Sequence, residues 1–110
     1  MRGVVEGFEN MRVVGEAADG QEAVHLATSL RPDVVIMDVN MPRMDGVEAT
    51  RLIKQTIPHI TVVGLSVSNN DQVKEAMKEA GAASYVTKDA APEELFIAIT
   101  TALEQRFTNN

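Results

Sequence analysis

The chain has 110 residues, of which 45% are hydrophobic, and its formal net charge is −6. This length suits one domain with a buried core, and the acidic balance argues against non-specific binding to nucleic acid or acidic membranes. The absence of cysteine excludes disulfides and thiolate metal sites, and no apolar run is long enough to span a bilayer. We expect a single domain over residues 1–110 in a cytoplasmic protein.

The first twenty residues carry weak signals of regular structure. Val4, Val5 and Phe8 have the spacing of one helix face, which predicts the last turns of a helix over residues 3–9. Residues 11–17 are typical of a strand, and Asp19-Gly20 then turns the chain.

Helical and strand patterns alternate over the rest of the chain. Apolar residues at helical spacing predict helices over residues 21–30, 47–57 and 71–80 and from Pro92 onward, before a frayed tail over residues 107–110. Short apolar runs predict strands over residues 34–38, 60–65 and 84–87, the first two buried on both faces. Such alternation predicts a parallel sheet with helices on both sides. The predicted inward faces of the first and last of these helices are Ala23, Leu26, Ala27 and Leu30, and Leu95, Ile99, Ala102 and Leu103.

Three of these strands end in polar residues, namely Asp38, Ser66 and Lys88. The carboxyl ends of parallel strands meet at one edge of a sheet, where ligands bind. A carboxylate can hold a phosphoryl group covalently, while an ammonium group and Mg²⁺ neutralise the transferred oxygens and a hydroxyl donates to one of them. Taken singly, Asp38 could be a cap, Ser66 a turn residue and Lys88 a surface lysine.

The loop Asp38-Val39-Asn40-Met41-Pro42-Arg43-Met44-Asp45-Gly46 resembles the signature of a known family, the receiver domains of bacterial two-component response regulators. The spacings from Asp38 to Ser66, Tyr85 and Lys88 are similar to that family too. Residues 14–20 and Lys88-Asp89-Ala90 look closest to the NarL/FixJ type. The resemblance implies a flavodoxin-like three-layer α/β fold and a role in phosphorelay signal transduction and transcription regulation, rather than an enzyme.

The resemblance also implies roles for individual residues. Asp38 would accept a phosphoryl group from a sensor histidine kinase, and Lys88 would contact it. Ser66 and Tyr85 would form a switch that changes an interaction face, and Mg²⁺ would be held by Asp38 and the Asn40 carbonyl. DNA would be contacted only through an output domain absent from this chain. A phosphatase of the haloacid dehalogenase type is a weaker alternative, because Asn40 stands where that family has an acid/base aspartate and cannot exchange a proton.

One departure from the family concerns the start of the chain, where the first strand and its acidic pair are missing. We expect a receiver truncated at its N-terminus, with four strands and an incomplete magnesium site. Loss of that central strand would forfeit on the order of 10 kcal/mol of apolar burial, as much as the net stability of many domains. We therefore expect a rearranged or domain-swapped sheet, a homodimer or strand-exchanged oligomer, or a poorly folding fragment. If residues 11–17 fill the vacant slot, Glu16 or Asp19 would lie beside Asp38, although a capping role is more common for such carboxylates. The alternative function is a degenerate receiver that binds partners without phosphorylation.

Overall fold

The computed structural model describes residues 15, 17–39, 45–66, 71–89 and 92–108. Three strands of the described chain form a parallel sheet in the order β1-β2-β3, namely β1 (Val34–Asp38), β2 (Thr61–Ser66) and β3 (Ser84–Thr87). The register pairs Asp38 with Leu65 and Ser66 with Thr87. The predicted helix over residues 3–9 lies outside the described residues. Of the predicted strand over residues 11–17, only Gly15 and Ala17 are described, and neither is in a strand.

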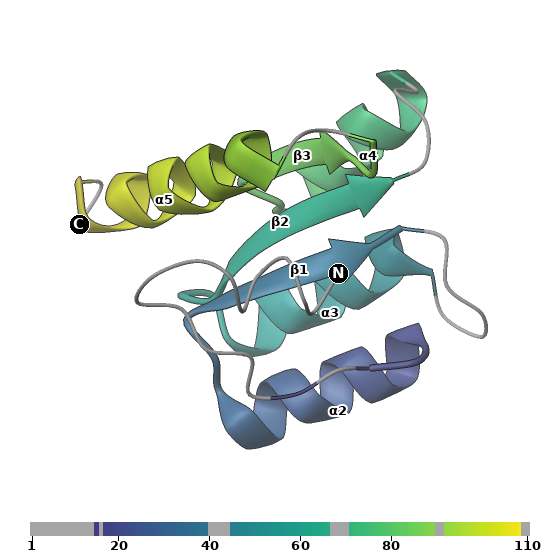
Figure 1. The fold of residues 1–110 in the computed structure, drawn as a ribbon. Coiled ribbons are helices and arrows are strands. Elements are labelled where there is room, and N and C mark those ends of the chain that lie inside the picture. The colour runs from purple at the N-terminus through teal and green to yellow at the C-terminus, as the bar shows by residue number, and fades with distance from the viewer. Residues whose placement is uncertain (1–14, 16, 40–44, 67–70, 90–91, 109–110) are drawn as a thin grey trace.

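The described helices follow the predicted periodicity closely. They are α2 (Gly20–Leu30), α3 (Gly46–Thr56), α4 (Asp71–Ala80) and α5 (Pro92–Thr108). The core clusters place α2, α3 and α4 against one face of the sheet and α5 against the other, and Figure 1 shows α3 and α5 on opposite sides of the strands. Among the described residues, no helix is long and apolar enough to cross a membrane.

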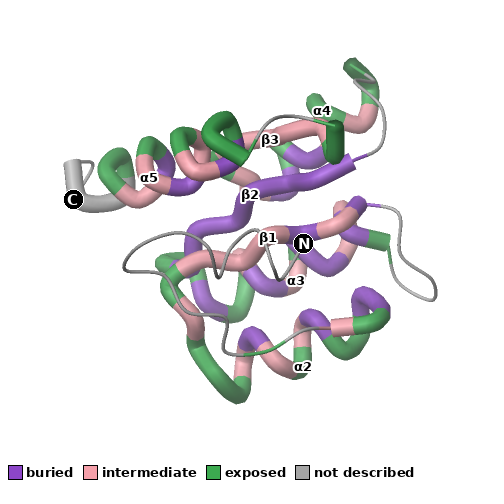
Figure 2. The backbone as a smooth tube through the Cα atoms, viewed as in Figure 1, coloured by how far each residue is buried: buried purple, intermediate pink, exposed green. Residues whose placement is uncertain are grey.

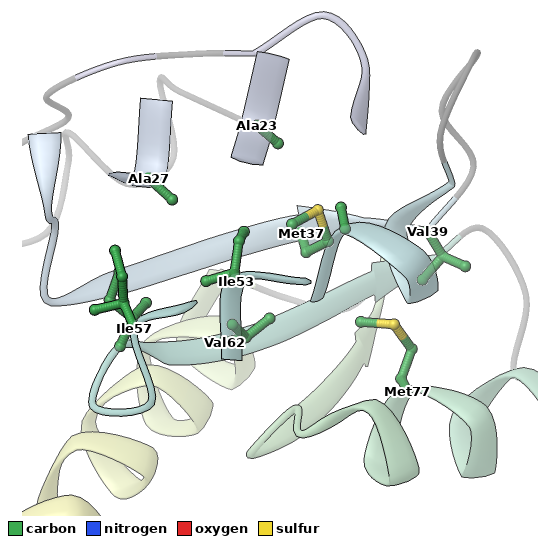
Figure 3. Packing of buried hydrophobic residues seen from close by; sticks show 10 residues of the cluster. Ala23, Ala27, Met37, Val39, Ile53, Ile57, Val62 and Met77 are labelled. Carbon is green, nitrogen blue, oxygen red and sulfur yellow. The ribbon is translucent and has the colours of Figure 1, made fainter. Parts of the chain in front are cut away.

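Two apolar clusters fill the space between the sheet and its helices. The larger joins α2, α3 and α4 to β1 and β2, with Met37, Ile53, Val62 and Met77 at 0–1% exposure, as Figure 3 shows. The smaller joins α5 to the other face of the sheet through Val63, Leu95, Ile99 and Ala102. The predicted inward face of the last helix is thus confirmed: Leu95, Ile99 and Ala102 are buried, and Leu103 is half-buried and packs against the same cluster.

The strands β1 and β2 differ in how far their residues are buried. All six residues of β2 are buried, as predicted. In β1 only Met37 is buried, while Val34, Val35 and Ile36 are half-buried (Figure 2). Both faces of β1 contact the core, as predicted, because Val35 packs against the larger cluster and Val34 and Ile36 pack against the smaller one. These side chains keep some exposure because β1 lies at an edge of the described sheet and pairs there with β2 alone.

Side chains and backbone turns fix the helix ends. Asp19 and Asp45 are the N-caps of α2 and α3, and each side chain accepts a hydrogen bond at 2.9 Å from the amide three residues ahead. Asp19 is 5% exposed. Its hydrogen bond from the Glu22 amide gives it the capping role that the sequence left open. Gly81 follows α4 with φ of +115°, the left-handed conformation that glycine commonly adopts after the end of a helix.

Two details of the helices differ from the sequence-based predictions. Leu30, placed on the inward face, is 46% exposed because it is the last residue of α2, just before the left-handed Arg31. The frayed tail is wrong for residues 107 and 108, since α5 continues to Thr108. Glu104, Gln105 and Arg106 are good helix formers and extend it.

Candidate functional site

Asp38 ends β1 at the carboxyl edge of the sheet, and the backbone around it is firmly held. The Val39 amide donates to the Leu65 carbonyl at 2.9 Å, and the Gly46 amide donates to the Val39 carbonyl at 3.1 Å. A Cβ atom on Gly46 would lie 2.5 Å from the Asp38 carbonyl oxygen and 2.7 Å from Val39 Cα. The start of α3 therefore packs on the Asp38 backbone at a distance that only glycine permits.

Lys88 follows β3 directly and forms an ion pair with Asp38. Its Nζ lies 2.7 Å from Asp38 Oδ2. The Lys88 and Asp38 side chains are 37% and 34% exposed, and exposed pairs of this kind add only about 0–1 kcal/mol to stability. The pair therefore does little to hold the fold together, yet it sets a cation beside a carboxylate that is open to solvent.

Ser66 ends β2 between the two charged residues. It is 2% exposed, and its carbonyl accepts a hydrogen bond of 2.6 Å from the Lys88 amide. The structure thus brings the three strand-end residues together at one edge: Asp38 meets Lys88 through its side chain, and Ser66 meets Lys88 through the backbone.

Tyr85 lies on β3, three residues before Lys88, and is half-buried. It pairs in register with Gly64 of β2 and packs against the larger core cluster. Tyr85 also lines a groove of about 530 Å³ between α4, β3 and α5, whose rim includes Lys74, Glu94 and Ile97. Ile97 is 59% exposed. Tyr85 therefore borders both the core and an open surface.

The described residues do not by themselves supply a magnesium site. They contain no group of three or more His, Cys, Asp or Glu residues that could hold a metal ion, and Mg²⁺ prefers octahedral oxygen coordination that includes one or two carboxylates. Asp38 offers one carboxylate. Asn40 and Glu16 lie outside the described residues.

Sequence reasoning missed one residue near this edge, Gly64. A Cβ atom there would lie 2.9 Å from Met77 Cε and 3.3 Å from Tyr85 Cδ2. The available signal was an isolated glycine inside an apolar strand, which often marks a close approach by another group.

Comparison with known proteins identifies the family to which this chain belongs. Residues 1–100 match the family described as the response regulator receiver domain, so the chain belongs to that family. It is therefore a receiver domain of the two-component response regulators, a signalling domain rather than a typical enzyme, with the flavodoxin-like fold. Receiver domains of this family generally bind Mg²⁺ and interact with sensor kinases.

Individual relatives indicate which type of response regulator this receiver domain resembles. The chain is 45% identical over 92 residues to response regulator GacA of Pseudomonas aeruginosa, covering 84% of this chain and 43% of that protein. It is 40% identical to the transcriptional regulatory protein YxjL of Bacillus subtilis, covering 92% of this chain and 46% of that one. A solved structure of a LuxR-family response regulator from Aurantimonas sp. SI85-9A1 is 37% identical, with a TM-score of 0.90 over 96% of this chain and 75% of that one. These relatives fit the NarL/FixJ type, and the chain spans less than half the length of the two curated ones.

Proposed function

We propose that this receiver accepts a phosphoryl group on Asp38 from a sensor histidine kinase. The observation that carries the proposal is the contact of 2.7 Å between Lys88 Nζ and Asp38 Oδ2 at the carboxyl edge of the sheet. This ion pair joins a solvent-accessible nucleophilic carboxylate to a cation that can neutralise the negative charge of the incoming phosphoryl group.

The transfer would exchange one bond to phosphorus for another. An Asp38 carboxylate oxygen would form a bond to phosphorus while the bond from phosphorus to the kinase imidazole breaks, and the imidazole nitrogen would keep the electron pair. Lys88 would then pair with a phosphoryl oxygen in place of the carboxylate. Ser66 would donate its hydroxyl to another oxygen, and Tyr85 would move inward behind it, changing the face formed by α4, β3 and α5.

The proposal also covers the residues that would hold Mg²⁺ and the molecules that would bind this chain. Asp38 would contribute one oxygen to Mg²⁺ and Asn40 its backbone carbonyl, with the phosphoryl group and water supplying the rest. Partners would include the sensor kinase in the cytoplasm, a second copy of the chain as a homodimer or strand-exchanged oligomer, and DNA only through an output domain.

Phosphorylation with acetyl phosphate and Mg²⁺, followed by intact-mass measurement, tests the acceptor. We expect one phosphoryl group per chain, released by hydroxylamine as an acyl phosphate is. Asp38→Asn should remove it. Asp33→Asn is the matched control, because Asp33 precedes the opposite end of the same strand and should leave labelling unchanged. Equal labelling of wild type and Asp38→Asn would contradict the proposal, and so would no labelling of either.

A further inference from the structure

Gly64 lies inside β2, the most buried strand of the described sheet, where glycine packs no side chain and weakens the strand. Among the described glycines, only Gly81 has a positive φ, so the Gly64 backbone does not require glycine. The space beside it favours glycine, since an added Cβ would lie 2.9 Å from Met77 Cε, the end of a flexible side chain, and 3.3 Å from Tyr85 Cδ2, so that one of these side chains would have to shift. The missing side chain of Gly64 therefore leaves a space that is occupied by Met77 from α4 and Tyr85 from β3.

This room lies between the two proposed switch residues. Side chains alternate along a strand, so Gly64 and Ser66 share one face of β2. Val62, also on that face, belongs to the cluster beneath α3 and α4, and Tyr85 packs against the same cluster. Tyr85 is opposite Gly64, and Ser66 is two residues further along β2. The edge of the tyrosine ring already lies beside Gly64, so the space at Gly64 adjoins the side of the ring that faces β2 and Ser66.

The two neighbours of this space differ in their freedom to move. Met77 is 0% exposed, and its sulfur lies 3.9 Å from the hydroxyl of Thr50, which is also 0% exposed. Figure 3 shows the Met77 side chain reaching from α4 toward the sheet. Tyr85 is half-buried and borders the open groove. A methyl group at residue 64 would therefore push the tyrosine ring outward, toward the groove.

We propose that Gly64 is a positioning residue of the switch: its missing side chain leaves the passage that Tyr85 uses to approach Ser66, and Met77 limits the width of that passage. The proposal rests on the proposed function, because it assumes that Tyr85 responds to a phosphoryl group on Asp38. Coupling of this kind has the size of an allosteric linkage, typically about 5–150-fold in affinity.

The position of the ring can be measured without phosphorylation. Tyr85 is the only tyrosine and the chain has no tryptophan, so tyrosine fluorescence reports this one side chain. We expect Gly64→Ala to increase acrylamide quenching of Tyr85. Gly15→Ala is the matched control, because its new methyl would meet only side-chain tips, those of Leu30 at 2.9 Å and Leu26 at 3.7 Å, and Leu30 is 46% exposed. Unchanged quenching in folded Gly64→Ala would overturn the proposal.

A second variant acts in the opposite direction and does not depend on the folding of Gly64→Ala. Met77→Leu keeps the side-chain volume but removes the terminal methyl above Gly64, a change that cores tolerate well. We expect it to reduce acrylamide quenching, because the ring gains room to move inward. Added to Gly64→Ala, it should return quenching toward the wild-type value. Increased quenching in Met77→Leu alone would overturn the proposal.

The link to the switch is measured by titrating beryllofluoride, an analogue of the phosphoryl group, in the presence of Mg²⁺. We expect Gly64→Ala to weaken apparent affinity at least about fivefold and the double variant to recover most of that loss. If the ring moves but affinity does not change, Gly64 has no role in the switch. If the wild type does not respond to beryllofluoride, the proposed function fails, and quenching alone still decides whether Gly64 positions Tyr85.

Discussion

The substitution Gly46→Ala tests how closely α3 is fitted to the phosphoacceptor. The new Cβ would lie 2.5 Å from the Asp38 carbonyl oxygen, 2.7 Å from Val39 Cα and 3.0 Å from the Asp38 carbonyl carbon. All three are backbone atoms of the segment that ends β1, so none can rotate away as a side chain would. Either the first turn of α3 or the Asp38 backbone must shift.

The magnitude follows from two opposing effects. Overpacking of a well-packed interior destabilises proteins by about 1–3 kcal/mol, and contact with backbone atoms, which cannot rotate away, favours the upper part of that range. Alanine gains at most about 1 kcal/mol over glycine in a helix. We expect the free energy of unfolding to fall by about 2 kcal/mol, which lowers the melting temperature by roughly 10 °C in a domain of this size.

Urea and thermal unfolding followed by circular dichroism measure this change. Gly15→Ala again serves as the control, because the same methyl group meets only flexible side-chain tips there. It should leave stability unchanged or raise it by about 0.4–1 kcal/mol. Because the clash is with the Asp38 backbone, Gly46→Ala should also weaken binding of beryllofluoride. Equal stability of the two alanine variants would refute the steric reasoning.

Substitutions at three further residues separate stability from signalling. Ile53→Ala removes a side chain at 0% exposure and should lower the free energy of unfolding in urea by about 2–5 kcal/mol; a loss below 1 kcal/mol would mean that the core collapses around it. Asp45→Ala loses the cap on the Glu48 amide and should lower stability by about 0.5–2 kcal/mol, whereas Asp45→Asn should keep most of it in the same assay. Lys88→Met should change stability by no more than about 1 kcal/mol but reduce the rate of phosphorylation by acetyl phosphate on the order of 10²-fold; the reverse pattern would give Lys88 a structural role.

The sequence predicted the described elements well because their patterns are local. The helix over residues 71–80 and the strand over residues 84–87 have the predicted bounds, since turn residues and periodicity mark both ends. The alternation of strands with helices predicted a parallel sheet, and a parallel sheet predicted that Asp38, Ser66 and Lys88 would meet at one edge. By contrast, the exposure of Leu30 depends on where α2 ends relative to its neighbours, which periodicity does not contain.

The space beside Gly64 was not predictable for a similar reason. It depends on Met77 from α4 and Tyr85 from β3 arriving at the same place, and these contacts join residues that are far apart in sequence. The partial burial of Val34, Val35 and Ile36 likewise depends on which strands are neighbours. An apolar run shows that a strand is suited to burial but does not show how many sides are covered.

The complete burial of β2 between two strands has a consequence for local opening. Amide protons in such a strand are expected to exchange with solvent mainly through global unfolding, whereas strands at the edge of the described sheet open at lower free energy. Ser66 belongs to β2, while Asp38 ends β1 and Lys88 directly follows β3. The serine is thus fixed to the most persistent strand of the described sheet, and the two charged groups lie at the ends of strands that open at lower free energy.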